Sequence, residues 1–463
     1  MIKNNASGKN RSQLMGSQPI GKLLWRFSLP GVIAMLINAM YNMVDTIFVG
    51  GLGPKAIAAL TVVFPVQMAF IALAAGTGIG ASSLISRRLG EGKTEEANKV
   101  VGQTLLIALI AGALIALLGV VFGHPLLEKL LGAPAEIVKP AFSYMIVITS
   151  GSLIVFINII GNNLVRAEGN PKLPMITMIM GALINIGLDP ILIYGLKMGV
   201  QGAAIATITA RGISAIVLLA YLFGKKTSFK LKKEYFKLKF SIWKEVYMVG
   251  GPHTLMSLVG SLTLVIINNV ASKFGFMPIA ALGILFKISQ FGFMPCLGIS
   301  TGALPIVGFN YGAGNLERVK ATISRVILIS GAITFTVALL TIIFSSQIVS
   351  IFNRDPDFLP MATRAMRIAF LGFAFTGTQV AFGTFFQGIG KGLPAAIIGI
   401  SRQLLILVPA LLLLVHFFGQ DGIWFALPIA DTLSFILGVI WTGAAARKLG
   451  IHFFSKTLSN TSA

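Results

Sequence analysis

The chain alternates between long apolar runs and short polar breaks over its whole length. Each run is long enough, at about 20 residues or more, to cross a hydrocarbon core of roughly 30 Å as an α-helix. The runs have approximate bounds 23–50, 56–86, 100–123, 138–165, 172–195, 200–223, 245–272, 278–309, 322–352, 360–388, 393–418 and 421–446. We therefore expect an all-α integral membrane protein with twelve transmembrane helices and no soluble domain between them.

Composition agrees with this pattern. The 463 residues are 55% hydrophobic and 11% charged, far from the range of a soluble domain of this length. The first 22 residues lack an apolar core ending in small residues, so we expect no cleavable signal peptide. The one cysteine, Cys296, lies in an apolar run, which excludes an intramolecular disulfide and a Cys-based metal site.

The net charge of +22 is distributed unevenly along the chain. If the N-terminus is cytoplasmic, the cytoplasmic segments hold 25 Lys and Arg residues and the opposite side holds eight. This bias fits the positive-inside rule and predicts a multi-pass protein of the cell membrane with both termini in the cytoplasm. We interpret the basic charge as a topology signal and not as a nucleic-acid site.

An internal repeat predicts the architecture. "AIAALTVVF" at 56–64 returns as "PIAALGILF" at 278–286, an offset of 222 residues, and Pro30 falls on Pro252 in the same register. Six crossings return the chain to its starting side, so we expect two six-helix bundles related by a pseudo-two-fold axis along the membrane normal. The expected segments are a polar cytoplasmic N-terminus (1–22), a first lobe (23–223), a basic cytoplasmic linker (224–244), a second lobe (245–446) and a cytoplasmic tail (447–463).

Two glycine motifs at equivalent positions of the repeat favour close packing over chemistry. "GTGIG" at 76–80 and "GISTG" at 298–302 both place glycines four residues apart, the small-xxx-small spacing of tightly packed membrane helices. "GISTG" also matches the nucleophile elbow of hydrolases, but the first repeat has Gly78 where Ser300 stands. The sequence also lacks the metalloprotease and Walker motifs, so we expect no enzyme and no ATP-driven pump.

Three of the fifteen acidic residues lie within apolar runs: Asp45, Asp189 and Asp431. Each costs on the order of 3 kcal/mol near the bilayer centre, so each is a functional candidate, with a helix-pinning hydrogen bond as the alternative. Asp45 precedes the outer end of its run by five residues, and Asp189 precedes Gly195 by six. The two carboxylates are therefore expected at the same depth.

Polar residues at helical spacing accompany both acids. Asn38, Tyr41 and Asn42 lie one or two turns before Asp45. Asn185 lies one turn before Asp189, and Thr207 lies in the next helix at a similar depth in the membrane. We expect the two polar stripes to face each other.

The second repeat contains no copy of these residues. Asp45 maps onto Ile267, while at an offset of 220 Asp189 maps onto Pro409 and Asn185 onto Leu405. Residues that serve packing alone would be repeated more evenly. The asymmetry therefore indicates chemistry in the first lobe.

Three motifs resemble one known family. "YNMVDTIFVGGLG" at 41–53, "INIGLDPILIYGLKMGVQGAAIATITAR" at 184–211 and "GISTGALPIVGFNYGAGN" at 298–315 resemble the multidrug and toxic compound extrusion (MATE) family, most of all its bacterial and archaeal members with an acidic first lobe. The resemblance implies export of organic, often cationic, amphiphiles driven by H⁺ or Na⁺. It implies no cofactor beyond the coupling ion, and the expected partners are small organic substrates and the lipid bilayer, with no nucleic acid, for a protein acting as a monomer.

The resemblance also assigns residues. It places a cation site at Asp45, Asn185, Asp189 and Thr207, with Tyr41 close by. Asn162 matches a further polar position, although its place in the 138–165 run is nearer the cytoplasmic end. Some relatives bind the cation at acids in the seventh and tenth helices, and this chain has no acid there.

The acid pair suggests an exchange mechanism. Two carboxylates in a low-dielectric cleft resist ionising together, so the pair can hold or release a proton, and its oxygens also suit sodium. Pro190 follows Asp189 directly and Pro30 interrupts the start of the first helix, so we expect both helices that carry the acids to have bend points. We expect that loading the acids changes helix packing and releases substrate outward.

The remaining intramembrane polar residues have weaker interpretations. Lys287 and Gln290 are candidates for lining the cleft, Arg402 for snorkelling or carbonyl pairing, and Asp431 for a local polar network. Two alternatives to an exporter stay open: a flippase for lipid-linked sugar precursors of the same broad fold, and an intramembrane enzyme acting on lipid-linked substrates. The sequence does not decide the substrate, the coupling ion or the resting conformation.

Overall fold

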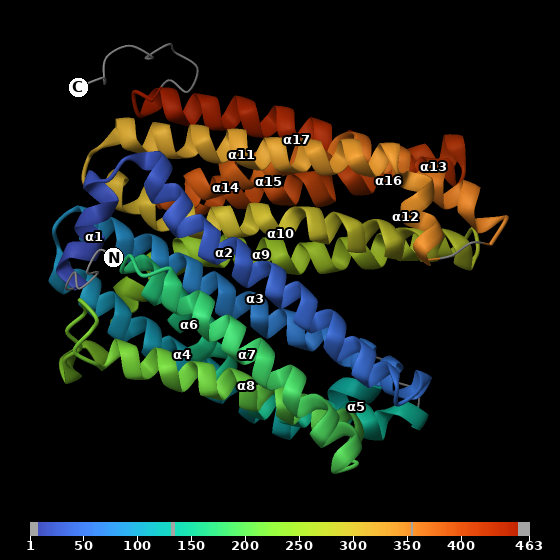
Figure 1. The fold of residues 1–463 in the computed structure, drawn as a ribbon, viewed down its shortest axis with the longest axis horizontal. Helices are drawn as coiled ribbons and strands as arrows, with labels where there is room; N and C mark the ends of the chain where they lie inside the picture. Colours follow the sequence, from blue (N-terminus) through green and yellow to red (C-terminus); the bar gives the residue numbers. More distant parts are fainter. Residues whose placement is uncertain (1–7, 131–134, 353–354, 452–463) are drawn as a thin grey trace, which may run out of the picture.

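A computed structural model describes residues 8–130, 135–352 and 355–451, and this part of the chain is built from helices (Figure 1). The first half contains α1 (Gly8–Ser17), α2 (Ile20–Gly50), α3 (Pro54–Gly90), α4 (Thr94–Pro125), η1 (Leu126–Leu130), α5 (Ala135–Ser150), α6 (Ser152–Ala167), α7 (Lys172–Pro190), η2 (Ile191–Gly195) and α8 (Gly199–Leu222). The second half contains η3 (Lys233–Phe236), α9 (Phe240–Ser272), α10 (Phe276–Gly312), α11 (Leu316–Ile343), α12 (Ser345–Phe352), α13 (Phe358–Phe373), α14 (Thr376–Gly388), α15 (Gly392–Ile400), η4 (Ser401–Leu407), α16 (Val408–Phe418) and α17 (Asp421–Lys448).

The helices confirm the all-α membrane fold. Within the described residues, 11 spans are long and apolar enough to cross a bilayer, and the bent pair α5 and α6 makes up to 12. Every predicted apolar run coincides with one helix or with two or three consecutive helical segments. Several helices extend past their runs, as where α9 begins at Phe240. The backbone hydrogen bonds of a helix continue into polar residues outside the bilayer, so hydropathy alone underestimates helix length.

Three expected continuous spans are interrupted, one of them at Phe344 between α11 and α12. The chain bends by 50° between α5 and α6, and a short break at residues 374–375 separates α13 from α14. Side-chain hydrogen bonds tie the latter two breaks to neighbouring helices: Thr334 Oγ1 of α11 donates to the carbonyl of Ala374 at 2.9 Å, and Ser152 Oγ at the start of α6 donates to that of Gly112 in α4 at 2.6 Å. Irregular backbone is tolerated within a membrane where such partners are present.

Each half of the chain has its own apolar core. One cluster of buried residues runs from Val49 to Val246, and a second runs from Ile267 to Ala430. A smaller cluster crosses between the halves, because Leu23 and Phe27 at the start of α2 pack with Ile299 of α10. Helix α2 therefore belongs to the second half at its beginning and to the first half at its end.

The two halves of the chain contact each other at the two glycine motifs, where the sequence predicted close packing. A Cβ on Gly80 of α3 would collide with the backbone of Val246 in α9, and one on Gly298 of α10 would collide with Val32 of α2. By residue count both crossings lie nearer to the start of α2 and α9 and to the end of α3 and α10 than to the opposite ends of these helices. From there the halves diverge towards the opposite ends of their helices.

Turn glycines repeat together with the helices. Gly53 and Gly275 have φ values of 100° and 98°, and Gly92 and Gly314 have values of 76° and 72°. These conformations are unfavourable for residues with a Cβ. The offset of 222 residues therefore preserves the turn geometry as well as the apolar pattern.

Segments outside the spans are also packed on the helices. Gln103 of α4 donates to the carbonyls of Tyr235 and Lys237, which holds the linker between the halves against the first half. Arg318 of α11 donates to the carbonyls of Met15 and Gln18, and Met15 is fully buried. The polar N-terminal segment thus contributes a helix that docks on the second half.

Candidate cation site between helices α2, α7 and α8

Two intramembrane carboxyl groups meet where α2 packs against α7. Asp45 comes from α2 and Asp189 from α7, and their side chains lie within hydrogen-bonding reach of each other. Asp189 is fully buried and Asp45 is half-buried. Two carboxyl groups form a hydrogen bond only when one of them carries a proton. The arrangement can therefore hold a proton between the helices.

Asn185 and Thr207 join this pair. Asn185 Nδ2 lies 3.3 Å from Asp189 Oδ1 and 3.4 Å from Thr207 Oγ1, and both residues are buried. Thr207 comes from α8, which packs on α7. One amide group thus connects the acid of α7 to the hydroxyl of α8.

The cluster contains three buried acceptor oxygens without a hydrogen-bond partner among the described residues. They are Asp45 Oδ1, Asn185 Oδ1 and Asp189 Oδ2. An unpaired buried acceptor is unfavourable, and carboxylate and amide oxygens are hard ligands for a cation. The donor set therefore fits a proton or a sodium ion.

Local geometry explains the juxtaposition. Asn185 and Asp189 are four residues apart and lie on one face of α7. Just beyond the acids, the hydroxyl of Tyr194 in η2 donates to the carbonyl of Phe48 in α2 at 2.5 Å, and the two rings pack edge to face. This contact fastens the ends of α2 and α7 together beside the acid pair.

The other predicted residues of α2 share its stripe. Tyr41 lies one turn before Asp45 and is half-buried, as is Asn38. Asn42 belongs to the same helix, but its side chain lies outside the described residues. The stripe therefore extends from the acid pair towards the contact between the halves.

The structure does not bring Asn162 to the acid pair. Its Oδ1 accepts a hydrogen bond from Thr177 Oγ1 at 3.0 Å, and its Nδ2 donates to the carbonyl of Asn158. Thr177 is twelve residues before Asp189 on α7, a rise of about 18 Å. Asn162 belongs to a separate contact between α6 and α7.

Lys287 and Gln290 lie one turn apart on α10, and both are exposed. Within the described part of the chain, neither forms a hydrogen bond or ion pair with the acid cluster. Their predicted place in a substrate cleft stays a prediction.

The two prolines occupy different kinds of position. Pro30 lies inside α2, which continues as one helix across it, beside the close contact between Gly31 and Gly298. Pro190 ends α7 and is followed by the π-helical turn η2. Each removes a backbone donor from its helix.

Two polar residues in contact between α3 and α5 were not anticipated. Tyr144 of α5 is buried, and its hydroxyl lies 3.5 Å from Gln67 Oε1 of α3. Gln67 was visible as a polar residue in the apolar run 56–86. Tyr144 carried no comparable signal, because tyrosines also occur in purely structural positions.

The third acid has a basic partner. Arg402 Nε lies 2.6 Å from Asp431 Oδ1, and Gln379 donates to the backbone carbonyl of Asp431 at 2.8 Å. The interpretation of Arg402 as snorkelling or pairing with a carbonyl was therefore wrong, because its partner is a carboxylate. The local polar network expected for Asp431 is present.

Comparison with protein families gives two matches along the chain. The family model described as MatE matches residues 30–191 and again 252–412. The matches begin at Pro30 and Pro252, the same separation of 222 residues as the internal repeat. Together they cover more than half of the chain.

Curated relatives match nearly end to end. The chain is 28% identical over 422 residues to "Multidrug export protein MepA" of Staphylococcus haemolyticus, covering 91% of this chain and 92% of that protein. It is also 28% identical over 437 residues to a "FAD transporter" of Shewanella oneidensis, covering 92% of this chain and 94% of that one.

Among solved structures, the chain is similar to one described as the "Outward-facing conformation of a multidrug resistance MATE family transporter of the MOP superfamily". The TM-score is 0.90 at 31% sequence identity, and the match covers 95% of this chain and 98% of that one. The agreement extends over both halves.

Proposed function

Since the chain belongs to the MatE family, we propose that it is a multidrug efflux transporter in which H⁺ or Na⁺ binds at the Asp45 and Asp189 cluster and drives export. It is a transporter and not an enzyme. The observation that carries the proposed ion site is the set of three buried oxygens that have no hydrogen-bond partner in the described part of the chain, contributed by Asp45, Asn185 and Asp189. A proton or a sodium ion satisfies such oxygens, and the same group can release either ion.

Helix α2 connects the ion site to the contact between the halves. Leu23 and Phe27 pack within the second half, whereas Asp45 faces α7 of the first half. Pro30 lies between these two parts and removes one backbone hydrogen bond. An ion bound at Asp45 that changes the packing of α2 on α7 would therefore also change how α2 packs on α10 at the contact between Gly31 and Gly298. A ligand shifts such an equilibrium only by its differential affinity for the two states.

The proposed substrates are small organic compounds, with amphiphilic cations as the first class to test. The support is the multidrug export named for the Staphylococcus haemolyticus relative and for the matched solved structure. The Shewanella oneidensis relative at equal identity is named for FAD, so relatives of this similarity differ in cargo. The flippase alternative has no comparable support among these relatives.

We propose that both termini are cytoplasmic and that the protein acts as a monomer in the cell membrane. The excess of Lys and Arg in the segments on the side of the termini supports this orientation. With that orientation the halves are in contact on the cytoplasmic side and separate towards the outside of the cell. This is the arrangement of a state that releases substrate to the outside.

Transport into proteoliposomes tests the proposal. Purified protein is reconstituted, a proton gradient or a sodium gradient is imposed, and accumulation of a fluorescent cationic dye is followed. We expect dye movement with at least one of the two gradients in wild type and no movement with either in Asp189→Asn. Gradient-driven transport at the wild-type rate by the Asp189→Asn protein would exclude the proposed site while leaving the family assignment intact.

A further inference from the structure

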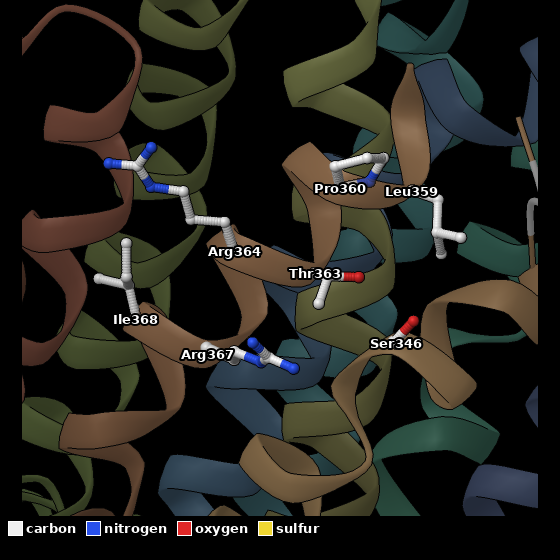
Figure 2. A pocket seen from close by; sticks show the side chains of 7 residues that line it. All are labelled: Ser346, Leu359, Pro360, Thr363, Arg364, Arg367 and Ile368. Carbon is white, nitrogen blue, oxygen red and sulfur yellow. The ribbon is translucent and has the colours of Figure 1, made fainter. Parts of the chain in front are cut away.

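A cavity of about 660 Å³ lies where α12 meets α13, far from the acid cluster. It is in the second half, at the ends of the helices opposite α1 (Figure 1, Figure 2). Its lining combines two arginines, two hydroxyl groups and three apolar side chains: Ser346, Leu359, Pro360, Thr363, Arg364, Arg367 and Ile368. The proposed transport mechanism uses none of them.

Arg367 provides the cation of this cavity. Its Nε donates to Ser345 Oγ at 2.8 Å, which fixes the guanidinium group and leaves both Nη groups for another partner. Figure 2 shows the guanidinium of Arg367 and the hydroxyl of Thr363 projecting to the side on which Ser346 lies. Among the residues that the structure describes, no carboxylate forms an ion pair with Arg367.

Arg364 differs from Arg367 in its surroundings. It extends to the other side of α13 in Figure 2, and its Nη2 lies 2.8 Å from Asp421 Oδ2 of α17. Its charge is therefore already compensated within the protein. The charge that a bound anion would neutralise is that of Arg367.

The depth of Arg367 in the bilayer makes an anionic partner favourable. The span Phe358–Gly388 has 31 residues. Its length of about 46 Å exceeds a hydrocarbon core of roughly 30 Å. When the excess is shared equally between the ends, Arg364 lies near the boundary and Arg367 about 5 Å inside it. An arginine at that depth reaches the head-group region or pairs with an anion.

The rest of the lining suits an amphiphile. Thr363 is 9% exposed, and its hydroxyl oxygen is buried without a hydrogen-bond partner among the described residues. Ser346 adds a second hydroxyl from α12, and the lining also includes the apolar residues Leu359, Pro360 and Ile368, of which Leu359 lies on the side of Ser346 in Figure 2. Hydroxyl donors and a guanidinium bind phosphate oxygens, and apolar side chains accept an acyl chain.

We propose that this cavity binds the phosphate group of an anionic membrane phospholipid. The Nη groups of Arg367 donate to the phosphate oxygens, Thr363 and Ser346 provide further donors, and an acyl chain lies against the apolar residues of the lining. Arginine forms charge-assisted, often bidentate hydrogen bonds with phosphate groups in this way. The proposal does not depend on the transport function.

The test is lipid binding to the delipidated full-length protein in detergent. Phosphatidylglycerol is titrated, and bound lipid is counted by native mass spectrometry. We expect Arg367→Gln to weaken binding about tenfold, since it removes a charge-assisted contact. Lys273→Gln is the matched control, because Lys273 is an exposed cation in the same half, at the same side of the membrane and outside the cavity. It should bind as wild type does.

Two further arms identify the source of the phosphate and guard against misfolding. Inorganic phosphate alone should not compete with phosphatidylglycerol at millimolar concentration, and effective competition would overturn the lipid assignment in favour of a soluble anion. Ser346→Leu fills the cavity from α12 while keeping Arg367, and it should also lose the bound lipid. If a folded Arg367→Gln or Ser346→Leu protein binds phosphatidylglycerol as well as wild type does, the proposal is overturned.

Discussion

Both halves of the chain bury an aspartate inside a membrane span, and the two surroundings differ in charge. In the second half, Asp431 is paired with Arg402 at 2.6 Å, so the protein itself balances the negative charge. In the first half, Asp45 faces Asp189, and neither forms an ion pair with a basic side chain among the described residues. The first-half pair needs an external cation to be neutral, whereas the second-half aspartate does not.

This difference separates a structural acid from a candidate coupling acid. A compensated pair has little affinity left for an ion, and removing one partner is destabilising because it leaves the other charge buried and uncompensated. An uncompensated pair with unpaired oxygens binds whichever cation reaches it. The charge of the neighbours, more than burial, therefore distinguishes the two aspartates, since Asp431 and Asp189 are both buried.

The largest expected effect is the loss of transport when the first-half acids are neutralised. Asp45→Asn and Asp189→Asn should each reduce gradient-driven dye export to the level of protein-free vesicles, because an amide keeps the shape but cannot take up a proton or balance sodium. Uptake is normalised to the monodisperse fraction after detergent extraction. A purely structural role for these acids predicts the reverse: reduced stability with normal transport per folded molecule.

The next effect is competition between drug and ion. If the drug and the ion each stabilise a different one of two conformations, binding of one ligand weakens binding of the other. A saturating concentration of coupling ion should then weaken the binding of a bulky organic cation by roughly 5- to 150-fold. Equilibrium binding of a fluorescent drug between pH 5 and 8, with and without sodium, measures it. The competition should persist in Asp431→Asn and vanish in Asp45→Asn. Equal drug affinity under all of these conditions in wild type would contradict the coupling.

A smaller effect distinguishes two asparagines on neighbouring helices. Asn185→Leu should weaken the apparent affinity for the coupling ion about tenfold, because it removes a ligand oxygen and the donor to Asp189 and Thr207. Asn162→Leu should leave the ion affinity unchanged, because its side chain bonds to Thr177. The ion concentration at half-maximal transport is the measurement. A larger effect of Asn162→Leu would move the site towards α6.

The smallest effect on transport is expected at the second-half acid. Asp431→Asn should keep transport per folded molecule within about twofold of wild type while lowering stability by roughly 1–3 kcal/mol, since Arg402 loses its charged partner. Thermal unfolding in detergent measures the loss. The double variant with Arg402→Gln should recover part of the stability, because no uncompensated charge remains. Loss of transport in Asp431→Asn with normal stability would place the ion site in the second half.

The positions of individual residues show how far sequence patterns reach. The common depth of Asp45 and Asp189 followed from counting residues to the ends of their runs, because each helical residue advances about 1.5 Å. The partner of Asp431 could not be counted in this way. Arg402 lies 29 residues earlier, on a different helix, and only the rotation of both helices about their axes brings the two side chains together. Tyr144 was missed because nothing in its sequence surroundings distinguishes it from a purely structural tyrosine.

The sequence by itself determined the all-helical membrane fold, the repeat and the positions of the intramembrane acids, because hydropathy and the thickness of a bilayer act on each segment independently. Repeated glycines such as Gly53 and Gly275 were likewise detectable, since their φ values are a local property. The tertiary structure alone decided which polar groups meet, that α2 begins in one half and ends in the other, and that Arg402 compensates Asp431. These features depend on helix rotation and crossing, which arise from packing between residues far apart in the chain.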